Sequence, residues 1–291
     1  MTTIISSLAD ISERYKALFV DLWGCVHNGV TAYPEAVAAL QAYRARGGIV
    51  VLVTNSPKPR AGVAEQMGAF GVPKDAYDTI ATSGDSARAA MFQGAVGQNV
   101  YFMGEWDRDE GFFEPLEILD NPTPITRVPL AEADGIVCCG PFDTLADPEV
   151  NRADFLYAKT QGMKLLCANP DIIVDRGEIR EWCAGALAKL YTDMGGESLY
   201  FGKPYPPIYD LARRRLSALG VSLEDSDILA IGDGPQTDIL GGMGESIDSL
   251  FITGGLAAAE TQTTHQPNPD ALSAYLAAEN VTPQFAIGKL R

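Results

Sequence analysis

The chain has 291 residues, of which 46% are hydrophobic and 21% are charged, and its formal net charge is −16 at pH 7. This length suggests about two domains with a sizeable core. The negative charge argues against nucleic acid and anionic membranes as partners. An anionic substrate would therefore need local positive charge from a cation, a lysine or helix N-termini.

The amino terminus has neither a basic start nor a long apolar run, so we predict no signal peptide. No segment approaches the roughly 18 apolar residues of a membrane span. The five cysteines are an odd number without a CxxC pattern, which indicates reduced thiols and a cytoplasmic location. Because only two histidines are present and no two cysteines have the close spacing of a zinc-ligand pair, the sequence argues against a structural zinc site.

The amino-terminal part alternates short apolar runs with helical patterns. We predict strands at residues 16–23 and 48–55, and helices at residues 34–48 and 59–71. Pro34, near the start of the first helix, is favourable at that position. This βαβ rhythm predicts parallel strands joined by right-handed crossovers.

The pattern loosens after Gly84, and residues 99–133 are expected to form short strands and loops. Further on we predict strands at 133–140, 163–171, 199–202, 227–234 and 247–255, helices at 178–196, 207–220 and 268–279, and a short run at 283–288. The simplest interpretation is an α/β core with a parallel sheet, made of residues 1–84 and 199–291. An α/β insert, residues 85–198, splits this core.

Residues that can carry chemistry follow the strands predicted for the core. They are Asp21 after ALFV, Thr54 and Asn55 after VVLV, Lys203 after LYFG, and Asp233 with Asp238 in ILAIGDGPQTDI. Open α/β sheets bind ligands at the carboxyl ends of their strands, so we expect these side chains to meet at one sheet edge. Each residue alone has a simpler explanation, since an aspartate or threonine can cap a turn or a helix and a lysine is usually a solvated charge.

Asp21, Asp233 and Asp238 would place three acids near one point, where like charges raise one another's pKa. A divalent cation relieves this repulsion, and Mg²⁺ suits one or two carboxylates plus phosphate oxygens. Lys203 adds positive charge, and Thr54 adds a hydroxyl group. Such a pocket fits a phosphoryl group. An aspartate can also be the nucleophile, and Asp21 is the best placed because the loop after the first strand lies centrally in such sheets.

These motifs resemble the haloacid dehalogenase superfamily, and within it the class IIA phosphatases. That class includes NagD-type sugar and nucleotide phosphatases and the phosphoglycolate and pyridoxal phosphate phosphatases. VDLWG is similar to the first motif, VTNS to the second, GKPYPPIY to the third and GDGPQTDI to the fourth. ANPD, residues 168–171, resembles a cap signature, and the insert stands where the class carries its cap. The resemblance covers nearly the whole chain.

The resemblance implies a Rossmann-like core with an inserted α/β cap of the C2 type, lying over the sheet edge and setting substrate choice. It implies Mg²⁺ as the cofactor, held by Asp21, by Asp233 and by the backbone carbonyl of Trp23. Asp21 would be the nucleophile, and Asp238 would hold a metal-bound water or Lys203. Caps of this class often pair, so the resemblance allows a homodimer.

The resemblance also implies which residues contact the substrate. The transferred phosphoryl group would be bound by Thr54, Asn55, Lys203 and the backbone amides of Trp23 and Gly24. Two cap residues, Asn169 and Asp171, would lie near the site; an ordinary turn is the simpler explanation of Asn169-Pro170-Asp171.

Trp23 departs from the family pattern. Family phosphatases usually carry a second aspartate there, which protonates the leaving oxygen and then activates water. Tryptophan has no proton to titrate for this role, and a general acid typically contributes ~10²–10⁴-fold in rate. Haloacid dehalogenases carry a tyrosine at this position and need neither acid nor metal. The ring of Trp23 either fills space under the cap or stacks on a substrate ring.

Three functions stay open. The first is a Mg²⁺-dependent phosphatase that hydrolyses a small sugar phosphate, nucleotide or aryl phosphate through an aspartyl phosphate. Trp23 favours the second, a catalytically impaired phosphate-binding member. The third is a dehalogenase-type hydrolase, against which stand the two acids of the fourth motif and the cap type. Cys25 and His27 could form a Cys–His pair, but a buried cysteine beside an unrelated histidine is the simpler interpretation, as is an exposed His265.

Overall fold

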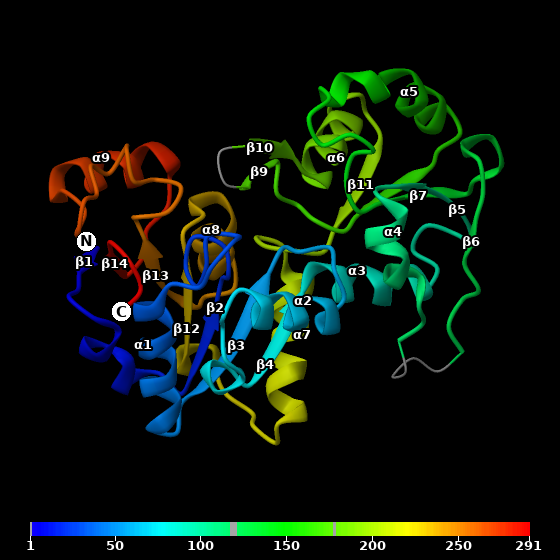
Figure 1. Cartoon of the computed structure of the whole chain (residues 1–291). Helices are drawn as coiled ribbons and strands as arrows, with labels where there is room; N and C mark the ends of the chain where they lie inside the picture. The colour runs from blue at the N-terminus through cyan, green and yellow to red at the C-terminus, as the bar shows by residue number, and fades with distance from the viewer. Residues whose placement is uncertain (1, 117–120, 177–178) are drawn as a thin grey trace. The chain divides into compact units, whose positions relative to one another are not determined.

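The computed structural model describes residues 2–116, 121–176 and 179–291, and it divides into two compact units. The first unit comprises Met1–Thr54, Ala64–Ala81 and Lys203–Arg291. The second comprises Asn55–Val63 and Thr82–Gly202. Figure 1 shows both units. The chain therefore leaves the first unit and returns to it, as expected for a core that an insert interrupts.

A seven-stranded sheet forms the centre of the first unit, in the order β1-β14-β13-β12-β2-β3-β4. Its strands are β1 (Thr3–Ile4), β14 (Phe285–Ile287), β13 (Asp248–Ile252), β12 (Ile228–Gly232), β2 (Ala17–Val20), β3 (Ile49–Thr54) and β4 (Thr79–Thr82). The central strands β12, β2 and β3 pair in parallel. All residues of β2 and β12 are buried, which explains why they appear in the sequence as unbroken apolar runs.

Helices cover this sheet and close its hydrophobic core. They are α1 (Pro34–Ala45), α7 (Pro206–Ala218), α8 (Leu240–Gly244) and α9 (Pro269–Glu279), while α2 (Arg60–Ala69) begins in the second unit and ends in the first. Ile208 and Leu216 of α7 join Phe19 and Val51 in one core cluster. A second cluster joins α9 to β13 and β14. Both chain ends lie in this unit, beside β1 and β14 (Figure 1).

The second unit has a parallel sheet of its own, in the order β11-β8-β7-β5-β6. Its strands are β5 (Asn99–Met103), β6 (Thr126–Arg127), β7 (Gly135–Cys138), β8 (Lys164–Cys167) and β11 (Glu197–Tyr200). An antiparallel pair, β9 (Ile173–Arg176) and β10 (Ile179–Trp182), stands apart from it. The helices are α3 (Ser83–Phe92), α4 (Trp106–Asp109), α5 (Arg152–Thr160) and α6 (Ala184–Asp193).

Alternation along β7 explains how this second sheet is buried on both faces. Ile136 and Cys138 face a cluster that includes residues of α5 and α6. Val137 and Cys139 face another cluster, which includes residues of α3. Since successive side chains of a strand point to opposite faces, one apolar run fills two cores. The second unit is thus an α/β layer structure with its own hydrophobic cores.

Short helical turns connect these elements. They are Leu8–Asp10, Ser12–Arg14, Lys74–Ala76, Glu110–Phe113, Leu130–Glu132, Pro148–Asn151 and Asp225–Asp227, with a π-helical turn at Pro235–Ile239. The π-helical turn runs directly into α8. It lies in the fourth sequence motif, where it positions Asp238.

The predicted fold class is confirmed: an α/β core with a parallel sheet carries an inserted second parallel sheet. The prediction that residues 199–202 add a strand to the core is wrong, because β11 pairs with β8 of the second sheet. The predicted helix at 178–196 is correct only from Ala184 onward. Ile179–Trp182 forms β10 instead, paired with β9, since cross-strand pairing overrides a weak helical pattern; residue 178 lies outside the described residues.

Helix α3 and helix α5 were not predicted at all. The residues of α3, SGDSARAAMF, include Ser and Gly, which have modest helix propensity. Thr82 caps this helix by accepting a hydrogen bond from the Asp85 amide at 2.9 Å, and its buried face packs against the second sheet. Packing rather than propensity therefore determines this helix.

All five cysteines are free and buried, which confirms the prediction of unpaired thiols. Among the helices that the structure describes, none is both long and apolar enough to cross a membrane.

Candidate active site

The candidate site lies at the carboxyl edge of the core sheet. Asp21 follows β2 and Asp233 follows β12, two strands that pair in parallel with Val20 opposite Ile231. The amide of Asp21 donates a hydrogen bond to the carbonyl of Ile231 at 2.8 Å. Thr54 ends β3, which pairs in parallel with β2 on its other side. Register thus brings Asp21, Asp233 and Thr54 to one edge, as predicted.

Lys203 joins two of the predicted acids. Its ammonium donates to Oδ1 of Asp21 and, at 2.7 Å, to Oδ1 of Asp238, and the residue is only 4% exposed. Burial alone lowers the pKa of Lys203, but the two carboxylates outweigh this and raise it well above its usual value. The ammonium therefore stays charged. It comes from the loop before α7 and not, as predicted, from the end of a core strand.

Asp238 is held by backbone groups of its own turn. The Gly234 amide donates to its Oδ2 at 3.1 Å. A Cβ at Gly232 would overlap the Asp238 carboxyl group, so the strand end must be glycine for this side chain to reach Lys203. The GDG sequence of the fourth motif therefore has a local steric reason.

Asp233 is closely surrounded by backbone atoms of two loops. Its Oδ2 accepts a hydrogen bond from the Leu256 amide at 3.1 Å. A Cβ at either Gly24 or Gly255 would overlap the carboxylate, and Gly24 also has a φ of +77°. Burial, followed by the charges of Asp21 and Asp238, raises the pKa of Asp233 well above its usual value. A bound cation would relieve the repulsion between these buried carboxylates.

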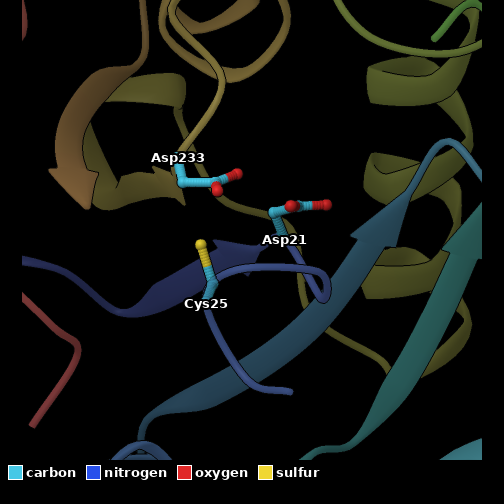
Figure 2. A group of neighbouring side chains, drawn as sticks. All are labelled: Asp21, Cys25 and Asp233. Carbon is cyan, nitrogen blue, oxygen red and sulfur yellow. The ribbon is translucent and has the colours of Figure 1, made fainter. Parts of the chain in front are cut away.

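Three side chains present possible metal ligands at this point. One ligand atom each from Asp21, Cys25 and Asp233 lies within 4.8 Å of the other two. Figure 2 shows the sulfur of Cys25 pointing from its loop toward the carboxylate of Asp233, with Asp21 beside them. Carboxylate oxygens fit the hard cation Mg²⁺, so the donor set fits the predicted metal, with an added sulfur. Burial, then the nearby acids, raises the pKa of the Cys25 thiol.

Trp23 packs within its own loop. Its half-buried ring makes an edge-to-face contact with His27, with centroids 5.4 Å apart and planes at 70°. A Cβ at Gly29 would overlap the Trp23 ring. These contacts lie within the loop itself, so both predicted roles of the ring, filling space under the cap and stacking on a substrate ring, stay predictions.

His27 is 2% exposed, and its Nδ1 accepts the Gly29 amide at 2.9 Å. Burial lowers the pKa of His27 to about 4, so the imidazole is neutral at physiological pH. Cys25 is grouped with the two acids, which does not favour the Cys–His pair considered above. His265 is exposed, as predicted.

Three predicted site residues belong to the second unit. The Asn55 side-chain amide donates to Oδ1 of Asp171 at 2.8 Å, and the Asp171 amide donates to Oδ1 of Asn169 at 3.0 Å. Gly185, near the start of α6, donates its amide to the Asp171 carbonyl at 3.1 Å. A Cβ at Gly185 would overlap that turn, so the turn lies directly on the start of α6. Asn55 follows Thr54 in the chain but interacts with this turn.

The structure therefore brings Asp21, Lys203, Asp233 and Asp238 together in the first unit, and Asn55, Asn169 and Asp171 together in the second. Sequence reasoning missed two residues that lie against the first group, Cys25 and Gly255. Cys25 was interpreted as an unrelated buried thiol, although it stands only four residues after Asp21. Gly255 was not singled out; the glycine pair that follows β13 is the signal of a close backbone approach.

Gly24→Ala should abolish metal binding, because the added Cβ would displace the Asp233 carboxylate. Gly47→Ala is the matched control: its φ is +90°, close to the +77° of Gly24, but a Cβ there meets nothing within 4 Å. Both changes should destabilise the fold by more than about 1 kcal/mol through backbone strain. Mg²⁺ at 100 times its dissociation constant should then raise the unfolding free energy of Gly47→Ala by about 2.7 kcal/mol and that of Gly24→Ala by close to zero.

Urea denaturation with and without Mg²⁺ measures both effects. If Mg²⁺ raised the unfolding free energy of the two variants equally, binding of the cation would not depend on the position of Asp233.

Comparison with known proteins places this geometry in a family. Residues 18–115 match the model of haloacid dehalogenase-like hydrolases, and residues 200–278 match a HAD-hydrolase-like model. The crystal structure of a haloacid dehalogenase-like hydrolase from Brucella suis 1330 is 37% identical, with a TM-score of 0.85, covering 99% of this chain and 100% of that chain.

Two curated relatives extend over most of the chain. The 5'-nucleotidase YutF of Bacillus subtilis (strain 168) is 26% identical over 264 residues, 88% of this chain and 94% of that protein. The ribonucleotide monophosphatase NagD of Escherichia coli (strain K12) is 22% identical over 246 residues, 84% of this chain and 90% of that protein. Together with the full-length match to the Brucella protein, these likenesses show that the chain belongs to the haloacid dehalogenase superfamily, in its NagD-like phosphatase class.

Proposed function

We propose that this protein is a Mg²⁺-dependent phosphatase that hydrolyses small phosphate monoesters through an aspartyl phosphate on Asp21. The observation that carries the proposal is the buried Lys203 ammonium bonded to Asp21 and Asp238, with Asp233 beside Asp21. The names of the nucleotidase and the ribonucleotide monophosphatase support a nucleotide or similar phosphorylated metabolite as the substrate. Sugar phosphates and aryl phosphates belong to the same proposed class.

In the proposed first step, a carboxylate oxygen of Asp21 attacks phosphorus. A bond forms between that oxygen and phosphorus, and the bond from phosphorus to the leaving oxygen breaks, with its electron pair going to the leaving oxygen. Lys203 orients the attacking carboxylate, since its ammonium donates a hydrogen bond to Oδ1 of Asp21. Water then attacks the aspartyl phosphate and regenerates Asp21.

Mg²⁺ would be held by Asp21, Asp233 and the backbone carbonyl of Trp23. When bound, it supplies positive charge for the phosphoryl oxygens. Lys203 supplies a second positive charge at the same edge, which also answers the need for local positive charge in a chain of net charge −16.

We assign binding of the transferred phosphoryl group to Thr54, Asn55 and Lys203, with the backbone amides of Trp23 and Gly24. Asn169 and Asp171, which the structure links to Asn55, would act in substrate choice. The second unit would serve as the cap that excludes water from the reaction.

Trp23 gives a specific reason to keep a second function. We propose that it occupies the place of the acid that protonates the leaving oxygen. Its ring is engaged by His27 and Gly29 and carries no titratable proton. The alternative is therefore a phosphate-binding protein with little turnover. A dehalogenase is less well supported, because such an enzyme needs no metal and would have no use for the buried acids Asp233 and Asp238.

An activity screen under two metal conditions separates these functions. Aryl, acyl, sugar and nucleoside phosphates and a haloacid are offered with saturating Mg²⁺ and again after chelation. The phosphatase proposal requires release of phosphate that is lost on chelation and restored by Mg²⁺. Halide release that is insensitive to chelation would identify a dehalogenase. Phosphate binding by calorimetry without turnover of any ester would identify the binding protein.

A further inference from the structure

Cys25 is a nucleophilic side chain that the proposed reaction does not use. It is 1% exposed and stands in the loop between Asp21 and α1. Its sulfur is nevertheless one of the three donor atoms that lie within 4.8 Å of one another at the catalytic edge. Figure 2 shows it facing the carboxylate of Asp233. The other four cysteines belong to the second unit.

This donor set differs in chemistry from an all-oxygen Mg²⁺ site. Mg²⁺ binds oxygen ligands and demands near-ideal octahedral geometry. Thiolate sulfur is a soft ligand that selects borderline or soft cations such as Zn²⁺ over Mg²⁺. Two carboxylates and one thiolate give three protein ligands, and a tetrahedral Zn²⁺ site with three protein ligands keeps its fourth position for water or substrate.

The distances are compatible with such a site after a small contraction. Zn–S and Zn–O bonds of about 2.3 and 2.0–2.2 Å place the ligand atoms of a tetrahedron about 3.4–3.6 Å apart. The three donor atoms here lie within 4.8 Å of one another, so side-chain movements of roughly 1 Å close the site. Asp233 remains anchored by the Leu256 amide, and Asp21 remains anchored by Lys203.

We propose that Asp21, Cys25 and Asp233 together can bind a thiophilic divalent cation, with Zn²⁺ as the representative ion, and that this cation, when present, competes with Mg²⁺ for Asp21 and Asp233. A coordination bond forms between Zn²⁺ and the Cys25 sulfur, and the thiol proton passes to solvent; no oxidant is required. The inference shares Asp21 and Asp233 with the proposed Mg²⁺ site, but it does not depend on turnover.

Cobalt substitution tests the sulfur ligand directly. Co²⁺ replaces Zn²⁺ in such sites, and a thiolate bound to Co²⁺ gives an intense near-ultraviolet charge-transfer band, whereas oxygen ligands give none. We expect the band in the wild-type protein, its loss in Cys25→Ser and its retention in Cys138→Ser. Cys138 is a matched control because it is as buried as Cys25, at 0% against 1% exposure, and lies in the second unit.

Calorimetric titration measures selectivity. Loss of an outer partner of a metal ligand already weakens metal binding by about 10–100-fold, so loss of the Cys25 ligand should weaken Zn²⁺ by at least about tenfold. The same change should leave Mg²⁺ affinity within about threefold, because Mg²⁺ draws on the oxygen donors. In a phosphatase assay, Zn²⁺ should inhibit the wild type. The Zn²⁺ concentration that gives half inhibition should be at least about tenfold higher for Cys25→Ser.

Several results would overturn the inference. One is Co²⁺ binding that Mg²⁺ displaces but that shows no sulfur band; another is equal Zn²⁺ affinity in the wild type and Cys25→Ser. If Cys25→Ser fails to fold, Cys25→Ala takes its place. If neither folds, Asp233→Asn removes another ligand and keeps all five thiols, so survival of the band in that variant would place the sulfur elsewhere. A band in a protein that hydrolyses no ester would refute only the proposed phosphatase function, and a phosphatase without the band would refute only this inference.

Discussion

Asp21→Asn should lower kcat on p-nitrophenyl phosphate by roughly 10⁴–10⁶-fold, the range seen when a catalytic nucleophile is removed. An amide oxygen is a poor nucleophile, and the neutral side chain also offers the metal a weaker ligand. After rapid acid quench with labelled substrate, the wild type should retain a covalent phosphoryl group and Asp21→Asn should not. The fold should survive, because Lys203 keeps its bond to Asp238 at 2.7 Å.

The control is a second aspartate of the same sheet. Asp248, at the amino end of β13, accepts a hydrogen bond from the Tyr15 hydroxyl at 2.6 Å. Asp248→Asn removes a carboxylate at the other edge of the sheet and should leave kcat within a factor of a few. If Asp21→Asn still carried the label or kept more than about a tenth of the activity, Asp21 would not be the nucleophile.

Trp23→Asp should raise kcat/KM for alkyl phosphates by ~10²–10⁴-fold, the usual contribution of a general acid. Aryl phosphates should gain far less, because a phenolate leaves readily without a proton. The wild type should also accumulate phosphoenzyme, since water attacks the aspartyl phosphate without a base. Steady-state kinetics on p-nitrophenyl phosphate and a panel of sugar phosphates, with Mg²⁺ saturating, measure the ratio between the two substrate classes.

Trp23→Asn separates acid chemistry from the loss of the ring. It matches aspartate in shape and loses the same contacts with His27 and Gly29, but it carries no acid. Any gain shared by both variants comes from the loss of the indole ring. If the wild type turns over an alkyl phosphate with a kcat on the order of 10 s⁻¹, another residue supplies the proton, and Asp171 would be the first to test.

Most strands of the core sheet could be predicted from the sequence because parallel central strands are buried on both faces. ALFV, IVVLVT and ILAIG are unbroken apolar runs, and this composition has few structural solutions other than a buried strand. The segment Ile179–Trp182 lacks such a run. Its strand, β10, is half exposed and exists through pairing with β9, which single-sequence periodicity does not detect.

The position of Lys203 shows how a correct residue can follow from a partly wrong argument. The strand before it was assigned to the core sheet, yet β11 belongs to the second sheet. Lys203 still reaches Asp21 because the chain turns back into the first unit at this residue. The prediction that Lys203 lies near Asp21 therefore depended on the order of the motifs along the chain and not on the strand assignment.

By itself, the sequence determined that Asp21, Thr54 and Asp233 stand at the ends of core strands, since each ends or directly follows an apolar run that indicates a buried strand. Only the tertiary structure decided which of them touch. Lys203 and Asp21 are 182 positions apart, and their contact depends on strand register and on the path of a loop, neither of which a local pattern encodes. The same holds for the approach of Cys25 to Asp233 and for the bond from Asn55 to Asp171, because packing over the whole fold sets the few ångströms that make a ligand or a partner.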